Sequence, residues 1–264
     1  MPELLRDAGA ATMALYVALF FGGLTVVNVA IGFAAERAFP GKRIFAVPLA
    51  EGQLGRELLG NVIFVAVTTA AFTMALSAGV VRFGDESWAR GIATFAVLMF
   101  GFQIFYYGLH RAMHHRALLF THRWHHQSQV TTALSAQSVS PFEAALWMLG
   151  YVGLPLVLSH LVPISFWGWA AYMAFNVSGN IVGHANVELA AAASGTRAAS
   201  LFANPWVYHA LHHARWTGHY SFQAALMDRI GSTEFADWPA LFRRVRAGNP
   251  LESLKTRGEP TDSS

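Results

Sequence analysis

Residues 92–126 read IATFAVLMFGFQIFYYGLHRAMHHRALLFTHRWHH, an apolar run that ends in two clusters of histidine. The run itself, residues 92–109, contains no charged residue and approaches the ~20 residues of a membrane-spanning helix. The histidines follow as His110-x3-His114 and as His122-x2-His125-His126. Histidines three or four positions apart lie near one another on a helix, which is a metal-ligand spacing. The stretch therefore predicts a membrane helix that carries metal ligands at one end.

The same kind of cluster recurs nearer the C-terminus, where residues 209–213 read HALHH. Between the clusters, His184 follows Asn176 and Asn180 at steps of four, and such buried amides are costly unless they line a site. Nine imidazoles exceed what one ion can use, so the pattern predicts two metal ions. The nine predicted ligands are His110, His114, His122, His125, His126, His184, His209, His212 and His213.

Helical geometry also suggests how the ligands divide between the two ions. In each His-x2-His-His cluster, the two histidines three apart are expected to stack on one face and bind one ion. The adjacent third histidine is then expected to bind the other ion. For the second cluster, this pairs His122 with His125 and sends His126 to the other ion.

Three histidines fall outside the predicted ligand set. His115 is turned by about 100° from His114 on a helix, so a surface position is expected. His160 is expected on the opposite side of the membrane from the clusters. His219 follows the third cluster closely, and either a supporting role or a role as a tenth ligand is open to it.

The composition indicates a membrane protein. Hydrophobic residues make up 54% of the 264 residues and charged residues only 12%, against about 25% in soluble proteins. The absence of cysteine excludes disulfides, zinc–thiolate sites, iron–sulfur clusters and covalently attached c-type haem. The net charge of +3 is mild, and no nucleic-acid-binding motif is present.

Five apolar stretches predict an all-α, polytopic helical bundle capped by the histidine-rich segments. They cover residues 8–33, 58–81, 92–109, 144–161 and 164–182, and the last two form a hairpin around Val162-Pro163. We expect one integral-membrane domain over residues 1–264. Within it, residues 1–90 supply N-terminal membrane helices, residues 91–235 the catalytic region and residues 236–264 a cytoplasmic tail.

The distribution of basic residues predicts the orientation of this bundle. Five crossings place all nine histidines on one side of the membrane, together with all of the 18 Lys and Arg residues except Arg6, Arg82 and Arg90. Cytoplasmic segments carry an excess of Lys and Arg. The active site is therefore expected on the cytoplasmic face of a multi-pass membrane protein.

The histidine clusters and their surroundings resemble the fatty acid hydroxylase/sterol desaturase superfamily over roughly residues 90–235. SPFE at residues 140–143 resembles a His-Pro-x-Glu segment of that family, and HANV at 184–187 is similar to its His-Ser-Asn-Val. NPWVYH at 204–209 resembles its Pro-x-x-x-His, and DRIG at 228–231 resembles the end of its Trp-Asp-Arg-x-Phe-Gly.

The chain departs from the family pattern at three places. The usual Arg-x-His before Pro-x-Glu is Ser138-Val139-Ser140, Asn-Tyr-Gly is His219-Tyr220-Ser221, and the Trp before Asp-Arg is Met227. These departures leave the substrate open: sterol, fatty acyl chain, sphingoid base, aminolipid headgroup and carotenoid all fit.

The resemblance implies a membrane-bound di-iron oxygenase that hydroxylates or desaturates a C–H bond of a membrane lipid with O2. A nitrogen-only site can hold iron with open positions, and zinc can replace iron at such a site. The expected supporting residues around the ligands are Glu143, Asn180, Asn186 and His219.

Electrons must come from outside this chain, because it carries no G-x-G-x-x-G motif and no haem domain. We expect a ferredoxin or cytochrome with its reductase. The basic residues Arg243, Arg244, Arg246, Lys255 and Arg257 could dock such a carrier, and contact with anionic lipid is the alternative role for them. The alternative function is a histidine-ligated zinc-dependent membrane hydrolase, for which Glu143 or Glu188 would serve as acid or base.

Overall fold

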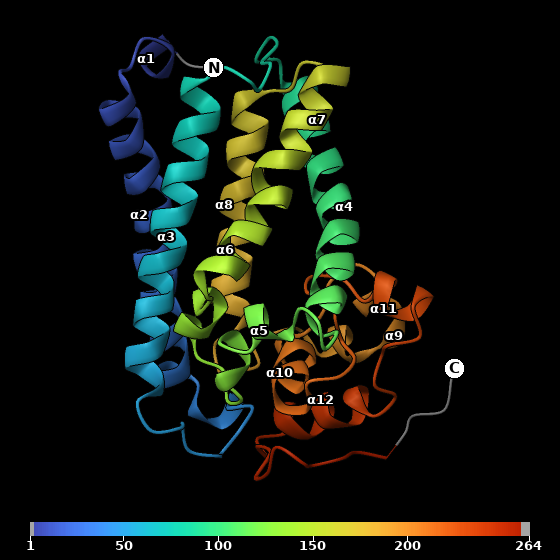
Figure 1. The fold of residues 1–264 in the computed structure, drawn as a ribbon. Coiled ribbons are helices and arrows are strands. Elements are labelled where there is room, and N and C mark those ends of the chain that lie inside the picture. Colours follow the sequence, from blue (N-terminus) through green and yellow to red (C-terminus); the bar gives the residue numbers. More distant parts are fainter. Residues whose placement is uncertain (1–2, 260–264) are drawn as a thin grey trace.

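The computed structural model describes residues 3–259, and every regular element in that part of the chain is a helix. Figure 1 shows long helices side by side, standing on a layer of short helices at one end. β-type pairing within residues 3–259 is confined to three isolated bridges, one of which joins Phe83 to Ile164 in the connections at the other end of the bundle. The predicted all-α architecture is confirmed for the described residues.

Four helical stretches of the described chain are long and apolar enough to cross a membrane. They are α2 (Ala10–Ala38), α3 (Gln53–Ser77), α4 (Trp88–Met113) and the stretch Pro141–Leu161. The last consists of α6 (Pro141–Met148), the π-helical turn η4 (Leu149–Gly153) and α7 (Leu154–Leu161). Their outer faces are apolar: Leu19, Val26 and Leu58 are 63%, 70% and 57% exposed. These stretches match four of the five predicted crossings.

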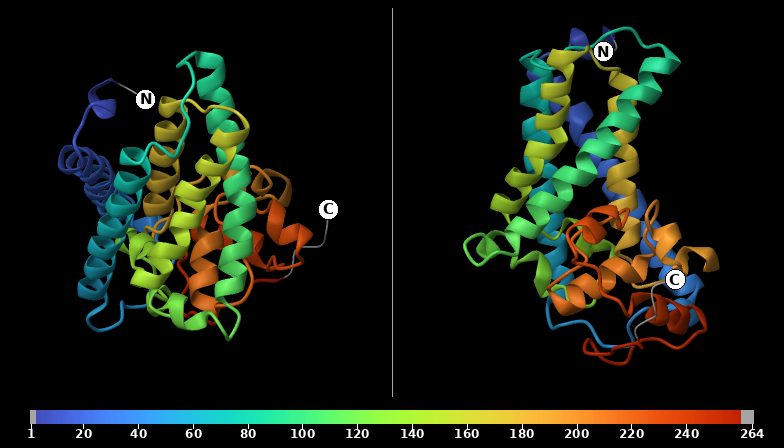
Figure 2. Two further views of the ribbon diagram at one scale, coloured as in Figure 1. Left: turned by 45° about the horizontal axis from the view of Figure 1, so that its top comes forward. Right: turned by 90° about the vertical axis from the view of Figure 1, so that its right-hand side faces the viewer.

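The fifth predicted crossing corresponds to α8 (Phe166–Gly183), which is not among these four apolar stretches. The helix is less apolar because it contains Asn176 and Asn180. It nevertheless runs the length of the bundle (Figure 2) and packs against α2 and α4. Its polar groups are shielded by neighbours, since the Tyr151 hydroxyl donates to Asn176 Oδ1 at 3.2 Å and Asn28 Nδ2 donates to Ser178 Oγ at 2.9 Å. Five crossings remain a prediction that the arrangement of the helices supports.

Aromatic packing holds the bundle together below its apolar exterior. The Phe102 and Tyr151 rings stack at a centroid distance of 4.7 Å, and Phe72 stacks on Trp169 at 5.1 Å. These contacts join α4 to η4 and α3 to α8. Aromatic pairs of this kind contribute about 0.5–1.5 kcal/mol beyond the area they bury, so the scaffold that presents the histidines is rigid.

Short helices form a cap at the end of the bundle where the histidines lie, and α1 (Glu3–Arg6) lies at the opposite end (Figure 1). A second apolar core joins Val207 and Leu211 to Trp238 and Phe242. The cap elements are η1 (Pro40–Lys42), α5 (Leu119–His122), η2 (His125–Gln127), η3 (Ala133–Gln137), η5 (Ala192–Gly195), α9 (Arg197–Ser200), α10 (Trp206–Arg215), α11 (Leu226–Ile230) and α12 (Trp238–Arg246).

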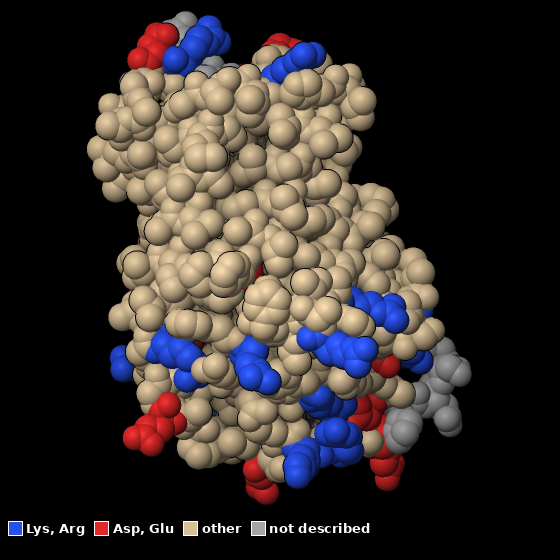
Figure 3. Space-filling model, viewed as in Figure 1, with Lys and Arg blue, Asp and Glu red and all other residues tan. Residues whose placement is uncertain are grey.

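Charged side chains gather at the two ends of the molecule (Figure 3). The visible face has a belt of Lys and Arg where the cap meets the bundle, a few charges at the opposite tip, and a broad uncharged zone between them. This is the arrangement of a bundle whose middle lies in hydrocarbon. The excess of basic residues at the cap is the asymmetry on which the predicted orientation rests.

We expect the N-terminus to lie outside the cell and the cap in the cytoplasm. The chain contains no cysteine, so single cysteines can be introduced at exposed Asp7 and exposed Ser253. In intact cells, a membrane-impermeant thiol reagent should label Asp7→Cys and leave Ser253→Cys unlabelled until the membrane is opened. Labelling of Ser253→Cys in intact cells would contradict this orientation, because it would place the basic cap outside.

Candidate metal centre

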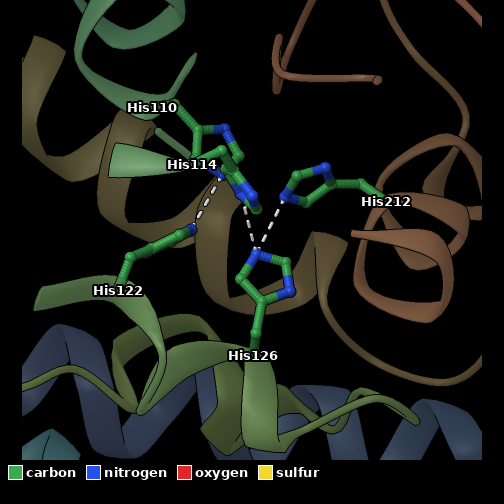
Figure 4. A group of neighbouring side chains, drawn as sticks. All are labelled: His110, His114, His122, His126 and His212. Atoms are coloured by element: carbon green, nitrogen blue, oxygen red, sulfur yellow. Dashed lines mark hydrogen bonds between the residues drawn. The ribbon is translucent and has the colours of Figure 1, made fainter. Parts of the chain in front are cut away.

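Five of the predicted ligands meet at the point where α4 enters the cap. The ligand atoms of His110, His114, His122, His126 and His212 all lie within 4.8 Å of one another. Figure 4 shows the five rings pointing toward a common centre from α4, from the segment of α5 and η2, and from α10. We call this set the five-histidine group.

The nitrogens that face each other in this group are all Nε2. Nε2 of His110 lies 3.1 Å from Nε2 of His122, and Nε2 of His126 lies 3.0 Å from that of His114 and 3.1 Å from that of His212. Imidazoles that bind one ion at about 2.1 Å, with their bonds at about 90°, have nitrogens about 3.0 Å apart. The group therefore has the spacing of a metal site.

The other four predicted ligands form a second set, the four-histidine group. The ligand atoms of His125, His184, His209 and His213 lie within 4.8 Å of one another, and all four residues are buried. Nε2 of His184 is 3.0 Å from Nε2 of His209. The two groups adjoin, since the His125 and His126 rings lie 5.7 Å apart. Together they contain all nine predicted histidines.

The predicted division of the ligands is wrong in both His-x2-His-His clusters, because the histidines that share a group are four positions apart rather than three. His122 shares its group with His126 rather than with His125, and His209 shares its group with His213 rather than with His212. On an α-helix, positions four apart differ by about 40° in direction and positions three apart by about 60°. In the second cluster, α5 ends at His122 and a 3-10 turn begins at His125, so regular α-helical stacking does not extend over it.

Burial keeps these imidazoles neutral at physiological pH. It lowers the pKa of His114 to about 3 and that of His184 to about 4. It also holds the pKa values of His126 and His212 well below the ordinary 6.5, and neighbouring histidines lower them further. A neutral ring keeps a lone pair on one nitrogen, which is the form that binds a metal.

The outward nitrogens of several rings are fixed by backbone carbonyls. His110 Nδ1 donates to the carbonyl of Tyr220 and His212 Nδ1 to that of Gly218, each at 2.7 Å. His184 Nδ1 donates to its own helix at the Asn180 carbonyl, 2.7 Å away. These bonds place the proton on Nδ1 and leave Nε2 free to bind a metal, as in known histidine–metal sites. His213 Nδ1 donates in the same way to the carbonyl of Ser128 at 2.9 Å.

For His122, the hydrogen-bond acceptor of Nδ1 is the carboxylate of Glu143 rather than a backbone carbonyl. His122 Nδ1 donates to Glu143 Oε1 at 2.7 Å, and Trp147 Nε1 donates to the same oxygen at 3.2 Å. This is the contact expected of a carboxylate that orients a ligand. The predicted position of Glu143 beside a ligand therefore agrees with the structure.

Some ring nitrogens of the four-histidine group have no hydrogen-bond partner, which is consistent with a bound metal ion. Three ring nitrogens of this group, His125 Nδ1, His209 Nδ1 and His213 Nε2, are buried and have no hydrogen-bond partner within residues 3–259. An unpartnered buried nitrogen costs about 1–3 kcal/mol. A metal ion would satisfy His213 Nε2, because Nδ1 of that ring already donates to the Ser128 carbonyl, and an all-nitrogen donor set suits iron, copper or zinc.

The other residues that we predicted from the sequence lie apart from the ligand atoms. The backbone carbonyl of Asn180 accepts the hydrogen bond of His184 Nδ1. The Asn186 side chain instead pairs with the backbone of Phe45: its Oδ1 accepts from the Phe45 N–H at 2.8 Å, and its Nδ2 donates to the Phe45 carbonyl at 2.9 Å. Asn186 therefore holds the first loop on the cap, and the expectation that it supports a ligand is wrong. His219 belongs to neither group, so its role as a tenth ligand is excluded by its position. Its ring stacks on Tyr208, with centroids 3.5 Å apart.

Exposed positions are found for the two histidines expected outside the site. His115 is exposed immediately after α4, and His160 is exposed in α7 toward the far end of the bundle from the cap (Figure 1). Both positions agree with the sequence-based expectations.

A buried carboxylate that we did not predict, Glu57, organises the segment after the second cluster. Its Oε1 accepts hydrogen bonds from Ser128 Oγ, Ser135 Oγ and Gln53 Nε2, and its Oε2 accepts one from Thr132 Oγ1, all at 2.7 Å. The segment it fixes supplies the Ser128 carbonyl that orients His213. The sequence signal was a lone carboxylate at the start of an otherwise apolar helix.

The carboxylate of Asp228 fixes the loop after α10 through hydrogen bonds, as that of Glu57 fixes the segment after the second cluster. Its carboxylate accepts from the backbone N–H groups of Tyr220 and Ser221 at 2.8 and 2.9 Å and from the Tyr208 hydroxyl at 3.0 Å. That loop presents the carbonyl of Tyr220 to His110. The Asp of the Asp-Arg motif is therefore explained by ligand positioning.

Glu188 positions the helix of the third cluster. Its carboxylate accepts from the N–H of Val207 at 2.8 Å, at the first turn of α10, and from the N–H of Ala190 at 2.8 Å. A carboxylate at a helix N-terminus is stabilised there by the unpaired N–H groups. Burial raises the pKa of Glu188 to about 7.

A small cavity of about 20 Å³ touches both groups. Its lining includes His122 of the five-histidine group, His125 of the four-histidine group, and Glu143, with Tyr106 and Trp147 as aromatic walls. A cavity of about 10–15 Å³ is enough for one water molecule. The space therefore admits about one water-sized molecule beside both sites.

The fold and the site define a class: an all-helical integral membrane protein with two adjoining histidine sites suited to metal ions. A family model for fatty acid hydroxylase matches residues 95–233. The chain belongs to this family, and the match covers nearly all of the histidine-bearing region.

Two kinds of curated relative share parts of the chain. It is 30% identical to the very-long-chain aldehyde decarbonylase CER1 of Arabidopsis thaliana over 154 residues, which are 54% of this chain and 23% of the relative. It is 41% identical to the methylsterol monooxygenase erg25A of Aspergillus fumigatus over 70 residues, 24% of this chain and 23% of the relative. The match thus spans about a quarter of each relative's length. No solved structure matches the chain significantly.

We expect Glu143→Ala to weaken metal binding by about 10- to 100-fold, because loss of a carboxylate that orients an imidazole typically costs that much. Glu143→Gln keeps an oxygen that can accept from His122 and should lose less. Metal retained by purified protein against increasing chelator measures both. If Glu143→Ala held its metal as tightly as the parent, the bond to His122 would have no part in ligand positioning.

Proposed function

We propose that the protein is an O2-dependent di-iron oxidoreductase that hydroxylates or desaturates a C–H bond of a membrane lipid. The observation that carries the proposal is the geometry of nine imidazoles, eight of them buried and His114 partly buried, divided into two adjoining groups with facing nitrogens 3.0–3.1 Å apart. Membership of the fatty acid hydroxylase family supports the same conclusion. So do relatives named as a methylsterol monooxygenase and an aldehyde decarbonylase.

In this proposal the five-histidine group holds one iron ion and the four-histidine group the other. When bound, such a pair supplies the activation of dioxygen for attack on an unactivated C–H bond. The carbonyls of Gly218 and Tyr220 keep His212 and His110 in the tautomer that leaves Nε2 unprotonated. Glu143 does the same for His122. Zinc outcompetes ferrous iron for imidazole sites, so isolated protein can carry zinc in their place.

The residues around the site also keep bulk water away. The nine ligands are buried except for His114, which is partly buried. Tyr106 and Trp147 stack with centroids 4.8 Å apart and close the small cavity on its membrane side. A dry site protects reactive species from side reactions.

The reducing equivalents come from an external carrier in this proposal, a ferredoxin or cytochrome served by its reductase. The exposed basic residues Arg243 and Arg244 on α12, with Lys255 and Arg257 beyond it, offer a surface for an acidic carrier. On the predicted orientation this surface faces the cytoplasm, where such carriers are found.

The hydrolase alternative needs a carboxylate that is free to act on water. Glu188 is bound to two backbone N–H groups at the start of α10, and Glu143 is bound to His122 and Trp147. Both candidates are therefore engaged in positioning ligands, which favours the oxygenase.

Oxygen uptake separates the two functions. Iron-loaded protein in lipid nanodiscs is reduced without oxygen by two electrons per chain and then mixed with oxygenated buffer. The oxygenase should consume oxygen in proportion to its iron content, and zinc-loaded protein should consume none. Iron-loaded, fully reduced protein that left oxygen untouched would contradict the proposal. Comparison of membrane lipids between a deletion strain and its parent by mass spectrometry then identifies the substrate.

A further inference from the structure

A second cavity leads from the four-histidine group to the side of the bundle. It has a volume of about 260 Å³ and lies between the lower parts of α4 and α8 and the segments at residues 202–206 and 222–223. One end reaches His209, a member of the four-histidine group. The other end lies at Phe175 and Phe202, which are 54% and 87% exposed. Exposed Phe side chains are favourable in lipid, so this side of the cavity is suited to face the membrane.

Two glycines of α8 line this cavity. Gly179 and Gly183 are four positions apart, so they lie on one face of the helix. A Cβ atom at Gly183 would lie 2.9 Å from the Phe222 ring, and one at Gly179 would lie 3.4 Å from Gln223 Nε2. Glycine inside a helix costs about 1 kcal/mol relative to alanine. At Gly183 the absent side chain lets the Phe222 ring pack against the helix, and at Gly179 it lets Gln223 lie close to the helix backbone.

The cavity is apolar except for two amide side chains with unused hydrogen-bonding atoms. Gln223 Nε2 and Asn204 Oδ1 are buried and find no partner in the described part of the chain. The other end of each amide is engaged: Gln103 Nε2 donates to Gln223 Oε1 at 2.8 Å, and Asn204 Nδ2 donates to the Phe222 carbonyl at 3.1 Å. The amides therefore present one donor and one acceptor.

We propose that this cavity binds the lipid substrate, and that the substrate is a neutral lipid whose polar end is a hydroxyl group. A hydroxyl can accept from Gln223 and donate to Asn204 at the same time, whereas a carboxylate or phosphate has no proton for Asn204. Among the described residues that line the cavity there is no Lys or Arg to balance an anion. The inference rests on the proposed function, because it takes His209 to be a metal ligand.

Equilibrium binding tests the inference without turnover. Zinc-loaded protein in detergent is titrated with radiolabelled 1-hexadecanol and, separately, with hexadecanoate of the same chain length. We expect the alcohol to bind at least about tenfold more tightly than the carboxylate, since an anion would be buried without a cation. Equal affinity for the two probes, or tighter binding of hexadecanoate, would overturn the inference.

Variants locate the binding to this cavity. Asn204→Leu and Gln223→Leu should each weaken hexadecanol binding by about tenfold, the worth of one buried hydrogen bond. Gly179→Leu should abolish binding by filling the cavity. Val97→Leu, at a 52% exposed position on α4 outside the cavity, is the matched control and should bind as the parent does. Metal content checks that each variant is folded. Folded Gly179→Leu protein with undiminished binding would also overturn the inference.

The two proposals fail in different ways. If the zinc-loaded protein binds hexadecanol as expected and the reduced iron-loaded protein leaves oxygen untouched, then only the proposed function fails. If oxygen is consumed and the alcohol shows no preference over the carboxylate, only the assignment of the cavity fails.

Discussion

His126→Ala is expected to remove one metal ion per chain and to reduce oxygen uptake to below about 1% of the parent's. Nε2 of His126 lies 3.0 Å from that of His114 and 3.1 Å from that of His212, so its ring stands at the centre of the five-histidine group. Residues that merely orient a ligand already account for about 10- to 100-fold in metal affinity or activity. Loss of a ligand itself should exceed that range. Metal analysis of purified protein, followed by oxygen uptake after anaerobic reduction, measures both effects.

Alanine at any of the other eight grouped histidines is expected to have the same consequence. His115→Ala and His160→Ala provide matched controls, because both residues are exposed histidines outside the two groups. These controls should keep two metal ions and most of the activity. If His160→Ala lost activity with its fold intact, the ligand set and the number of membrane crossings would both be wrong, since both place His160 across the membrane from the site.

Glu57→Leu is expected to cause the largest loss of stability, on the order of 3–5 kcal/mol. The substitution removes an acceptor of four hydrogen bonds and leaves buried donors on Ser128, Thr132 and Ser135 without their partner. Each unsatisfied buried donor costs about 1–3 kcal/mol, although hydroxyls can partly rotate to new partners. The segment that presents the Ser128 carbonyl to His213 should loosen with it, so bound metal should also fall.

Thermal unfolding in detergent and metal content together measure the effect of Glu57→Leu. Glu57→Gln keeps one acceptor oxygen and should lose about half as much stability. Glu51→Leu is the control, because Glu51 is an exposed residue just before α3. A midpoint for Glu57→Leu equal to that of the control would show that the hydrogen bonds of Glu57 do not hold this segment.

Much of the bundle was predictable because a membrane constrains sequence so strongly. A helix in hydrocarbon needs a long apolar run, and four such runs correspond to α2, α3, α4 and Pro141–Leu161. The fifth helix, α8, is less apolar, and its asparagines are sheltered by Tyr151 and by neighbouring helices. Its composition would also suit a buried helix of a soluble protein. Its packing against α2 and α4 shows that it belongs to the bundle.

The sequence by itself determined the nine histidines that assemble and the all-α scaffold that carries them. Both follow from local rules: histidine spacing along a helix, and the length and polarity of apolar runs. Only the tertiary structure decided which histidines share a group, because each group combines side chains from segments far apart in the sequence. It also decided what orients each ring. The partners of His110 and His212 are backbone carbonyls of Tyr220 and Gly218. Every residue carries a carbonyl, so no side-chain pattern can mark the ones that the fold brings to a ligand.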